Sequence, residues 1–123
     1  MKKVIFSEKA PAPIGPYSQA IQFGNELFVS GQIALKNGVM IQDNIQDETH
    51  QVMKNLQAIL EAAEMTFDNV VKCTIFVKDL NNFQAINEVY GTYFEANPPA
   101  RETVEVSRLP KDANVEISCI AVK

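Results

Sequence analysis

Arg101 is the residue whose type and setting point most clearly to chemistry. It is one of only two arginines, and it follows the dipeptide Pro98-Pro99 at a distance of two residues. Proline fixes its own φ and biases the preceding residue towards extended backbone, so the segment that presents this guanidinium has little freedom. A guanidinium pairs with a carboxylate through two parallel hydrogen bonds, which the nine lysines cannot do. The pattern predicts a carboxylate-binding residue, although a solvated surface arginine fits this fragment equally well.

Two further positions combine polar or open groups with apolar surroundings. Ser30 interrupts an apolar segment directly before Gly31, where the missing side chain would let a ligand approach the backbone. A bulge or close strand packing explains the same pair. Asn87 shares one helical line with Phe83, Tyr90 and Phe94, so its amide lies among aromatic rings and needs a partner. That partner is either a ligand or a backbone carbonyl.

Turn signals and periodicity predict the elements that position these residues. The first two strands are joined at Gly24-Asn25, and Asn37-Gly38 leads into a third. One helix begins at Asn44 or Asp47 and runs to Ala63, and a second runs from Asn81 or Asn82 to Asn97. The predicted strands cover residues 17–23, 27–33, 39–41, 70–78, 103–109 and 115–122.

This order of elements, βββ-α-β-α-ββ, predicts an α+β sandwich in a single domain over residues 1–123, with both helices on one face of the sheet. Some strands carry apolar residues on both faces, as the segment 115–122 does. Such a strand needs cover on both sides, so we expect a second subunit to supply the cover on the face without helices.

Composition excludes several classes of function. The net charge of −4 argues against a protein that binds the phosphate backbone of nucleic acids. No apolar run is long enough to span a bilayer and none resembles a signal peptide, so we expect no membrane contact and a cytoplasmic location. Cys73 and Cys119 each lie in a β-branched run, which predicts buried free thiols. His50, the only histidine, is predicted on the surface, and no His/Cys cluster has metal-ligand spacing.

Several motifs together resemble the reactive intermediate deaminase A family, also called the YjgF family. They are Ala12–Ala20, Val29–Ile33, Asn87–Tyr90, Pro99–Arg101 and Arg108–Asp112, and the match is collinear over nearly the whole chain. The resemblance implies a chorismate-mutase-like fold with a six-stranded mixed sheet. It also implies a homotrimer whose three sheets form a central barrel, with ligand sites in the clefts between subunits.

The function implied by the resemblance is hydrolysis of reactive 2-enamino and 2-imino acids to 2-keto acids and ammonia. The substrates would include 2-aminoacrylate, 2-iminopropanoate and 2-iminobutanoate, and neither a metal nor an organic cofactor is expected. By the same resemblance Arg101 is the catalytic residue and grips the substrate carboxylate. The other residues carried over as substrate-binding are Tyr17, Ser30, Gly31, Asn87 and Thr103. From the sequence alone Tyr17 is equally well a core ring with its hydroxyl satisfied.

Two positions depart from the family pattern. Thr103 stands where many relatives have cysteine, which counts against a covalent thiol mechanism. Ser118 replaces the second acid of a Glu-Ile-Glu sequence, the group proposed in the family to position the hydrolytic water. Glu116 lies about 6–7 Å from it on the same strand face. It either acts through a water molecule or forms a structural salt bridge, and we favour the salt bridge. If the lost acid limits the rate, Ser118→Glu should raise it.

Imine hydrolysis is the preferred interpretation, because a protonated imine is electrophilic and orientation supplies much of the catalysis. The alternative is a regulatory trimer that binds small carboxylates or keto acids without useful turnover. A ribonuclease or translation-inhibitor role fits an acidic chain poorly, since His50 has no paired acid-base motif.

Overall fold

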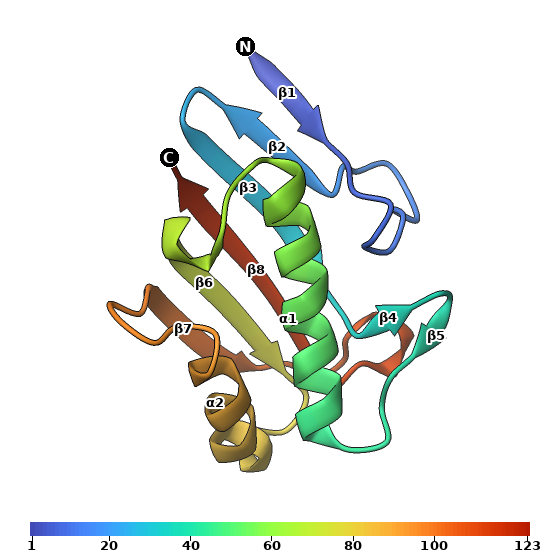
Figure 1. Cartoon of the computed structure of the whole chain (residues 1–123). Coiled ribbons are helices and arrows are strands. Elements are labelled where there is room, and N and C mark those ends of the chain that lie inside the picture. Colours follow the sequence, from blue (N-terminus) through green and yellow to red (C-terminus); the bar gives the residue numbers. More distant parts are fainter.

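Six strands form one sheet in the order β1-β2-β3-β8-β6-β7 (Figure 1), and the computed structural model describes all residues, 1–123. Only β6 and β7 run parallel, and all other neighbours are antiparallel. The predicted six-stranded mixed sheet is therefore confirmed. Its strands are β1 (Lys2–Ile5), β2 (Ala20–Phe23), β3 (Glu26–Gln32), β6 (Val70–Val77), β7 (Ala100–Glu105) and β8 (Val115–Val122).

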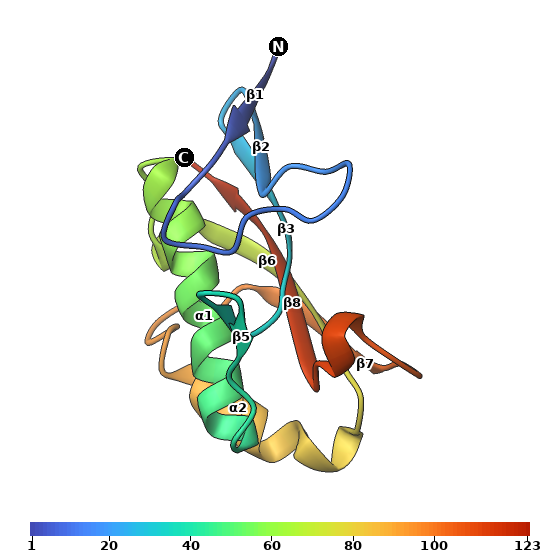
Figure 2. The same cartoon turned by 90° about the vertical axis from the view of Figure 1, so that its right-hand side faces the viewer.

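Two helices cover one face of this sheet, as predicted (Figures 1 and 2). They are α1 (Ile45–Ala62) and α2 (Phe83–Gly91). Asn44 caps α1, since its Oδ1 accepts a hydrogen bond of 2.8 Å from the backbone N–H of Asp47. Short 3₁₀ turns precede β6, α2 and β8, namely η1 (Phe67–Asn69), η2 (Leu80–Asn82) and η3 (Pro110–Asp112). Neither α1 nor α2 has the length and hydropathy of a membrane-spanning helix.

The core lies between the helices and this face. Val52, Leu56 and Ile59 of α1 pack towards Ile75 and Ile117 of the central strands, and all five are at most 1% exposed. Burying a side chain of this size stabilises the fold by roughly 1.5–3 kcal/mol, so this stripe fixes how α1 lies on the sheet.

The two cysteines are buried and free, as predicted. Cys73 of β6 lies directly opposite Cys119 of β8 in the antiparallel register. Burial raises the pKa of both thiols, which keeps them protonated and unreactive.

Several element boundaries differ from the prediction. β1 was not predicted, because Lys2 and Lys3 obscure the pattern and Ile5 alone of its residues is buried. The predicted strand 39–41 leaves the main sheet, and Val39–Met40 (β5) instead pairs with Leu35–Lys36 (β4) in a separate hairpin. The predicted strand 17–23 begins only at Ala20, and the predicted strand 103–109 spans residues 100–105 instead.

The second helix ends at Gly91 and not at Asn97. Glycine is a poor helix former, and the Thr92 hydroxyl donates to the Val89 carbonyl at 2.6 Å, which closes the last turn. Tyr93 and Phe94 still pack against the core, so the apolar line continues past the end of the helix.

The face of the sheet away from the helices, called the open face below, is also rich in apolar side chains. Phe28 of β3 is 43% exposed and Val104 of β7 is 42% exposed, whereas Val29 next to Phe28 is buried. The two-faced strands inferred from the sequence are present. Large exposed apolar surface of this kind is typical of a protein interface.

Candidate functional site

Arg101 lies on the edge strand β7 and points to the face that the helices cover. The parallel register places it beside Cys73. Its Nη1 donates a 2.7 Å hydrogen bond to Oδ1 of Asn87. Its Cζ lies 5.1 Å from the ring centroid of Tyr90 and 5.6 Å from that of Phe83. Three residues of α2 therefore hold the guanidinium in one orientation by a hydrogen bond and cation–π contacts.

The guanidinium remains free to bind an anion. The chain contains two ion pairs, Lys72–Glu102 and Arg108–Asp112, and neither involves Arg101. A guanidinium has five N–H donors, and Asn87 takes one of them. Oδ1 of Asn87 accepts a hydrogen bond from Arg101, a partner that the sequence did not indicate, and a ligand as the partner of its Nδ2 group stays a prediction. We therefore describe Asn87 as a residue that positions Arg101.

Two buried hydroxyls near Arg101 have no hydrogen-bond partner, Tyr90 Oη and Thr103 Oγ1. Thr103 follows Arg101 by two residues on the same face of β7. Burial, and next the thiol of Cys73, raises the pKa of Tyr90, so its hydroxyl stays protonated. The surroundings of Arg101 thus offer unused hydroxyl groups as well as guanidinium donors.

Four of the other predicted residues line a hollow of about 500 Å³ between the N-terminal loop, β3 and η3, called hollow A below. Tyr17, Ser30, Gly31 and Glu116 are among its lining residues. The Tyr17 ring is 52% exposed and its hydroxyl accepts a long 3.4 Å hydrogen bond from the Ile14 N–H, so Tyr17 is not a core residue.

Ser30 and Gly31 determine the shape of hollow A by their contacts with the Ser18 backbone and the Glu116 side chain. The Ser30 hydroxyl donates to the Ser18 carbonyl at 2.7 Å and ties the N-terminal loop to β3. The register between β3 and β8 shifts between Val29 and Gln32, so the bulge considered from the sequence is present. A Cβ at Gly31 would lie 2.5 Å from Oε2 of Glu116. Gly31 therefore makes room for this carboxylate, which fits the close-packing explanation, and its contact with a ligand stays a prediction.

Glu116 is the acid of hollow A. It forms no ion pair, so the structural salt bridge favoured from the sequence is wrong. Burial raises the pKa of this carboxyl group above its ordinary value. Ser118 does not line hollow A and instead lies opposite Thr74 in the β6–β8 register. The geometry therefore favours Glu116 over position 118 as the group that could position water.

One chain does not bring these two groups together. Arg101, Asn87 and Thr103 lie on the helix side of the sheet at β7, whereas Ser30 and Glu116 lie on the open face of β3 and β8. Three strand spacings, about 14 Å, separate β7 from β3. Arg101 and Glu116 therefore lie on opposite faces of the sheet and cannot contact one small ligand within a single chain.

Some of the residues that line hollow A were not identified as site residues from the sequence. Lys111 lines it with a left-handed backbone (φ 54°), which no local signal predicts for a lysine. Gln19 was missed although it is a polar residue before an apolar strand, and it is 1% exposed. Leu35, which was also missed, adds an apolar wall.

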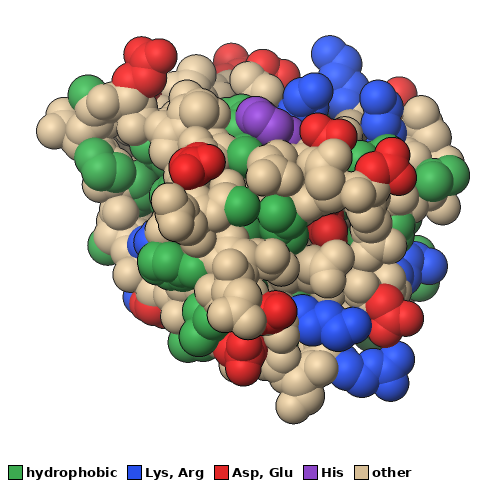
Figure 3. All heavy atoms as spheres, turned by 90° about the horizontal axis from the view of Figure 1, so that it is seen from below, with side chains coloured by type: hydrophobic (Ala, Val, Ile, Leu, Met, Phe, Trp, Pro, Cys, Tyr) green, Lys and Arg blue, Asp and Glu red, His purple; other side chains and the backbone are tan.

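The only histidine lies at the surface, as predicted, with its ring partly buried (Figure 3). Nδ1 of His50 lies 2.9 Å from the Tyr93 hydroxyl. No three His, Cys, Asp or Glu side chains converge on a point that could hold a metal ion.

Known proteins resemble this chain in sequence and in structure. Residues 7–123 match the endoribonuclease L-PSP family. A RutC family protein of Pyrococcus horikoshii is 54% identical, with 100% of this chain and 99% of that protein covered. The 2-iminobutanoate/2-iminopropanoate deaminase of Mus musculus is 45% identical over 100% of this chain and 93% of its own. The structure of Escherichia coli TdcF with bound serine superposes with a TM-score of 0.94 at 41% identity, covering 98% of both chains.

Proposed function

Because this chain belongs to the endoribonuclease L-PSP family, which contains YjgF and RutC proteins, we propose that it hydrolyses small 2-imino acids to 2-keto acids and ammonia. The observation that carries the proposal is Arg101, a guanidinium held by Asn87 and two aromatic rings with its remaining donors free. The mouse relative named as an imino-acid deaminase supports the same reaction class.

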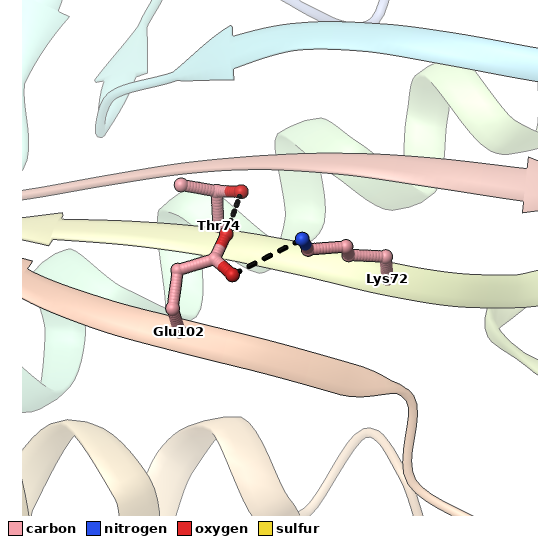
Figure 4. A network of polar contacts seen from close by, with 3 residues as sticks. All are labelled: Lys72, Thr74 and Glu102. Atoms are coloured by element: carbon pink, nitrogen blue, oxygen red, sulfur yellow. Dashed lines mark hydrogen bonds and ion pairs between the residues drawn. The ribbon is translucent and has the colours of Figure 1, made fainter.

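The site requires a homotrimer, in which the half-site around Arg101 of one copy meets hollow A of the next. The exposed apolar side chains of the open face support burial in such an assembly. Three polar side chains on this face are already paired (Figure 4): Lys72 Nζ lies 3.1 Å from Glu102, and Thr74 donates to Glu102 at 2.6 Å. These contacts lower the pKa of Glu102, the Thr74 hydrogen bond more than Lys72. A paired carboxylate is easier to cover than a free one.

The chemistry follows from the two half-sites. Arg101 binds the carboxylate of the substrate and fixes the position of its C2 atom. Glu116 positions a water molecule and accepts its proton as the water oxygen bonds to C2 and the C=N π electrons move to nitrogen. Glu116 returns that proton to the amino group, the C2–N bond breaks with its electron pair leaving on ammonia, and the C2 hydroxyl gives its remaining proton back to Glu116 as it becomes the ketone. A general base of this kind contributes about 10²–10⁴-fold.

The proposal is tested by releasing 2-aminoacrylate and its imine from a serine dehydratase and following formation of pyruvate. Added protein should accelerate release of the keto acid in proportion to its concentration. An unchanged rate at every protein concentration would exclude the hydrolase. Binding of keto acids in the absence of turnover would instead establish the regulatory trimer, the alternative that the serine-bound structure of TdcF makes reasonable.

We do not propose ribonuclease activity, although the family carries that name. The net charge is −4, and His50 faces a tyrosine hydroxyl and not an acid. Proteins that bind nucleic acid strands rely on clustered Lys and Arg along the backbone contact. We expect neither a nucleic acid partner nor an organic cofactor.

Substitution of Asn87 should weaken substrate binding without changing the fold. Asn87→Ala frees the guanidinium to rotate and should raise the KM. Asn87→Asp places a carboxylate against Arg101 and should raise the KM further, because the new carboxylate competes with the substrate. Glu88→Ala, on the exposed side of the same helix, is the matched control. Equal KM values for both Asn87 variants and the wild type would show that Asn87 does not position Arg101.

The proposed trimer is tested by introducing a charged side chain on the open face. The wild type should sediment at about three times 13.7 kDa, and Phe28→Asp should sediment as a monomer that has lost turnover. Val39→Asp replaces an exposed apolar residue of β5, away from the main sheet, and should remain a trimer. A wild type that sediments as a monomer at micromolar concentration would contradict the proposed site between two copies.

A further inference from the structure

A second hollow of about 550 Å³ lies between the N-terminal loop, the β4–β5 hairpin and α1, and is called hollow B below. Three lysines from three separate segments line it: Lys9 from the loop, Lys36 from β4 and Lys54 from α1. None of them takes part in an ion pair, and Glu8 is the only carboxylate in the lining. The lining of one hollow therefore contains three lysines that form no ion pair.

This concentration of charge stands out against the rest of the molecule. The chain has a net charge of −4, so its overall field repels anions. Seen from below, lysine and arginine side chains gather towards one side of the molecule, the side on which Figure 1 shows the β4–β5 hairpin, whereas carboxylates are scattered (Figure 3). Hollow B is a local positive site that an anion can use.

The walls of hollow B are fixed before any ligand binds. On the loop side, Oε1 of Gln19 accepts from the Ser7 N–H at 2.7 Å, and its Nε2 donates to the Pro11 carbonyl at 2.9 Å. On the helix side, Asn55 donates to the carbonyls of Ile33 and Leu35 at 2.9 and 3.0 Å. A site with rigid walls loses little conformational entropy on binding.

The lining also has an aromatic side. Phe6 is 54% exposed and borders hollow B together with Leu35. An exposed phenyl ring in a lining that also contains three lysines offers a stacking surface for a planar group that carries negative charge. Lysine ammonium groups bind phosphate as mobile point charges, whereas planar carboxylates are better matched by arginine.

We propose that hollow B binds a small organic phosphate, with the phosphate among Lys9, Lys36 and Lys54 and a planar ring against Phe6. This site is separate from hollow A and shares with it only a wall that contains Pro11, Ala12 and Leu35. The proposal does not depend on imine hydrolysis, and failure of either one leaves the other standing.

Calorimetric titration of the full-length protein with adenosine monophosphate, inorganic phosphate and adenosine tests the proposal. Adenosine monophosphate should bind more tightly than inorganic phosphate, and adenosine should bind most weakly. The double variant Lys36→Gln/Lys54→Gln should weaken binding of the nucleotide at least about tenfold, since each lysine lost removes a charged hydrogen bond. Lys78→Gln removes an exposed lysine outside hollow B and should change nothing.

Phe6→Ser separates the two parts of the site. It should weaken binding of adenosine monophosphate and leave that of inorganic phosphate unchanged. The proposal is wrong if neither phosphate compound binds at millimolar concentration, or if the double lysine variant binds the nucleotide as well as the wild type. Equal affinity for inorganic phosphate and adenosine monophosphate would refute selection of an organic phosphate.

Discussion

Replacing Arg101 by lysine is expected to raise the KM for 2-iminopropanoate by roughly 10- to 100-fold while the melting temperature stays close to that of the wild type. Lysine keeps the charge but loses the planar fork that pairs with a carboxylate. It also cannot keep both the hydrogen bond to Asn87 and the stacking on Tyr90 that orient the guanidinium. Steady-state kinetics of keto-acid release, together with thermal melting, measures both effects.

The chain supplies its own control for this substitution. Arg108 is the only other arginine, its side chain is 80% exposed, and it contacts only Asp112 at 3.5 Å. Arg108→Lys should leave the KM unchanged, because an exposed pair of this kind contributes little. If Arg101→Lys also leaves the KM and turnover unchanged, the carboxylate of the substrate is bound elsewhere.

Replacing Glu116 by glutamine is expected to lower kcat about 10²- to 10⁴-fold, the usual contribution of a general base. Glutamine has nearly the same shape and fits the space above Gly31, so the effect reports the loss of the carboxylate and not of packing. The control is Glu102→Gln, which removes a carboxylate of the open face that is already paired with Lys72 and Thr74. Wild-type turnover in Glu116→Gln would show that orientation by Arg101 is sufficient.

The same substitution should stabilise the protein at neutral pH. Burial raises the pKa of Glu116 in the folded state, so the folded chain binds this proton more tightly than the unfolded chain. The stability linked to that proton is fully present below the ordinary pKa of 4.5 and is lost as the pH rises through the raised value. Glu116→Gln should therefore melt above the wild type at neutral pH. The difference should vanish in acid, and a constant difference at all pH values would contradict this account.

Local patterns were sufficient to predict the helix-covered sheet. The alternation in 70–78 and 115–122 and the apolar stripe of α1 each follow from a few neighbouring residues, and the structure confirms them. β1 was not predicted, because an edge strand with one buried residue has almost no periodic pattern of apolar residues. The place of β8 between β3 and β6 was also not predictable from local pattern, because it depends on long-range pairing.

The types of residue at the site could be predicted from the sequence, but the contacts between these residues could not. The sequence showed that Asn87 needs a partner, yet naming Arg101 requires the parallel pairing of β6 and β7 that brings β7 beneath α2. The contact of Glu116 with Gly31 depends on the bulge in β3, which shifts the register against β8. Without that contact, no pattern in the sequence favours Glu116 over position 118 as the group that positions water.

The shared site is tested most directly by mixing two variants that are each impaired at low substrate concentration, Arg101→Lys in its KM and Glu116→Gln in its kcat. Arg101→Lys and Glu116→Gln proteins are unfolded together, refolded at equal concentrations and assayed for keto-acid release. If Arg101 of one copy acts with Glu116 of another, random mixing restores about a quarter of the sites and a corresponding share of wild-type turnover. If the wild type is active but the mixture is no more active than the separate variants, the result contradicts a site built from two copies.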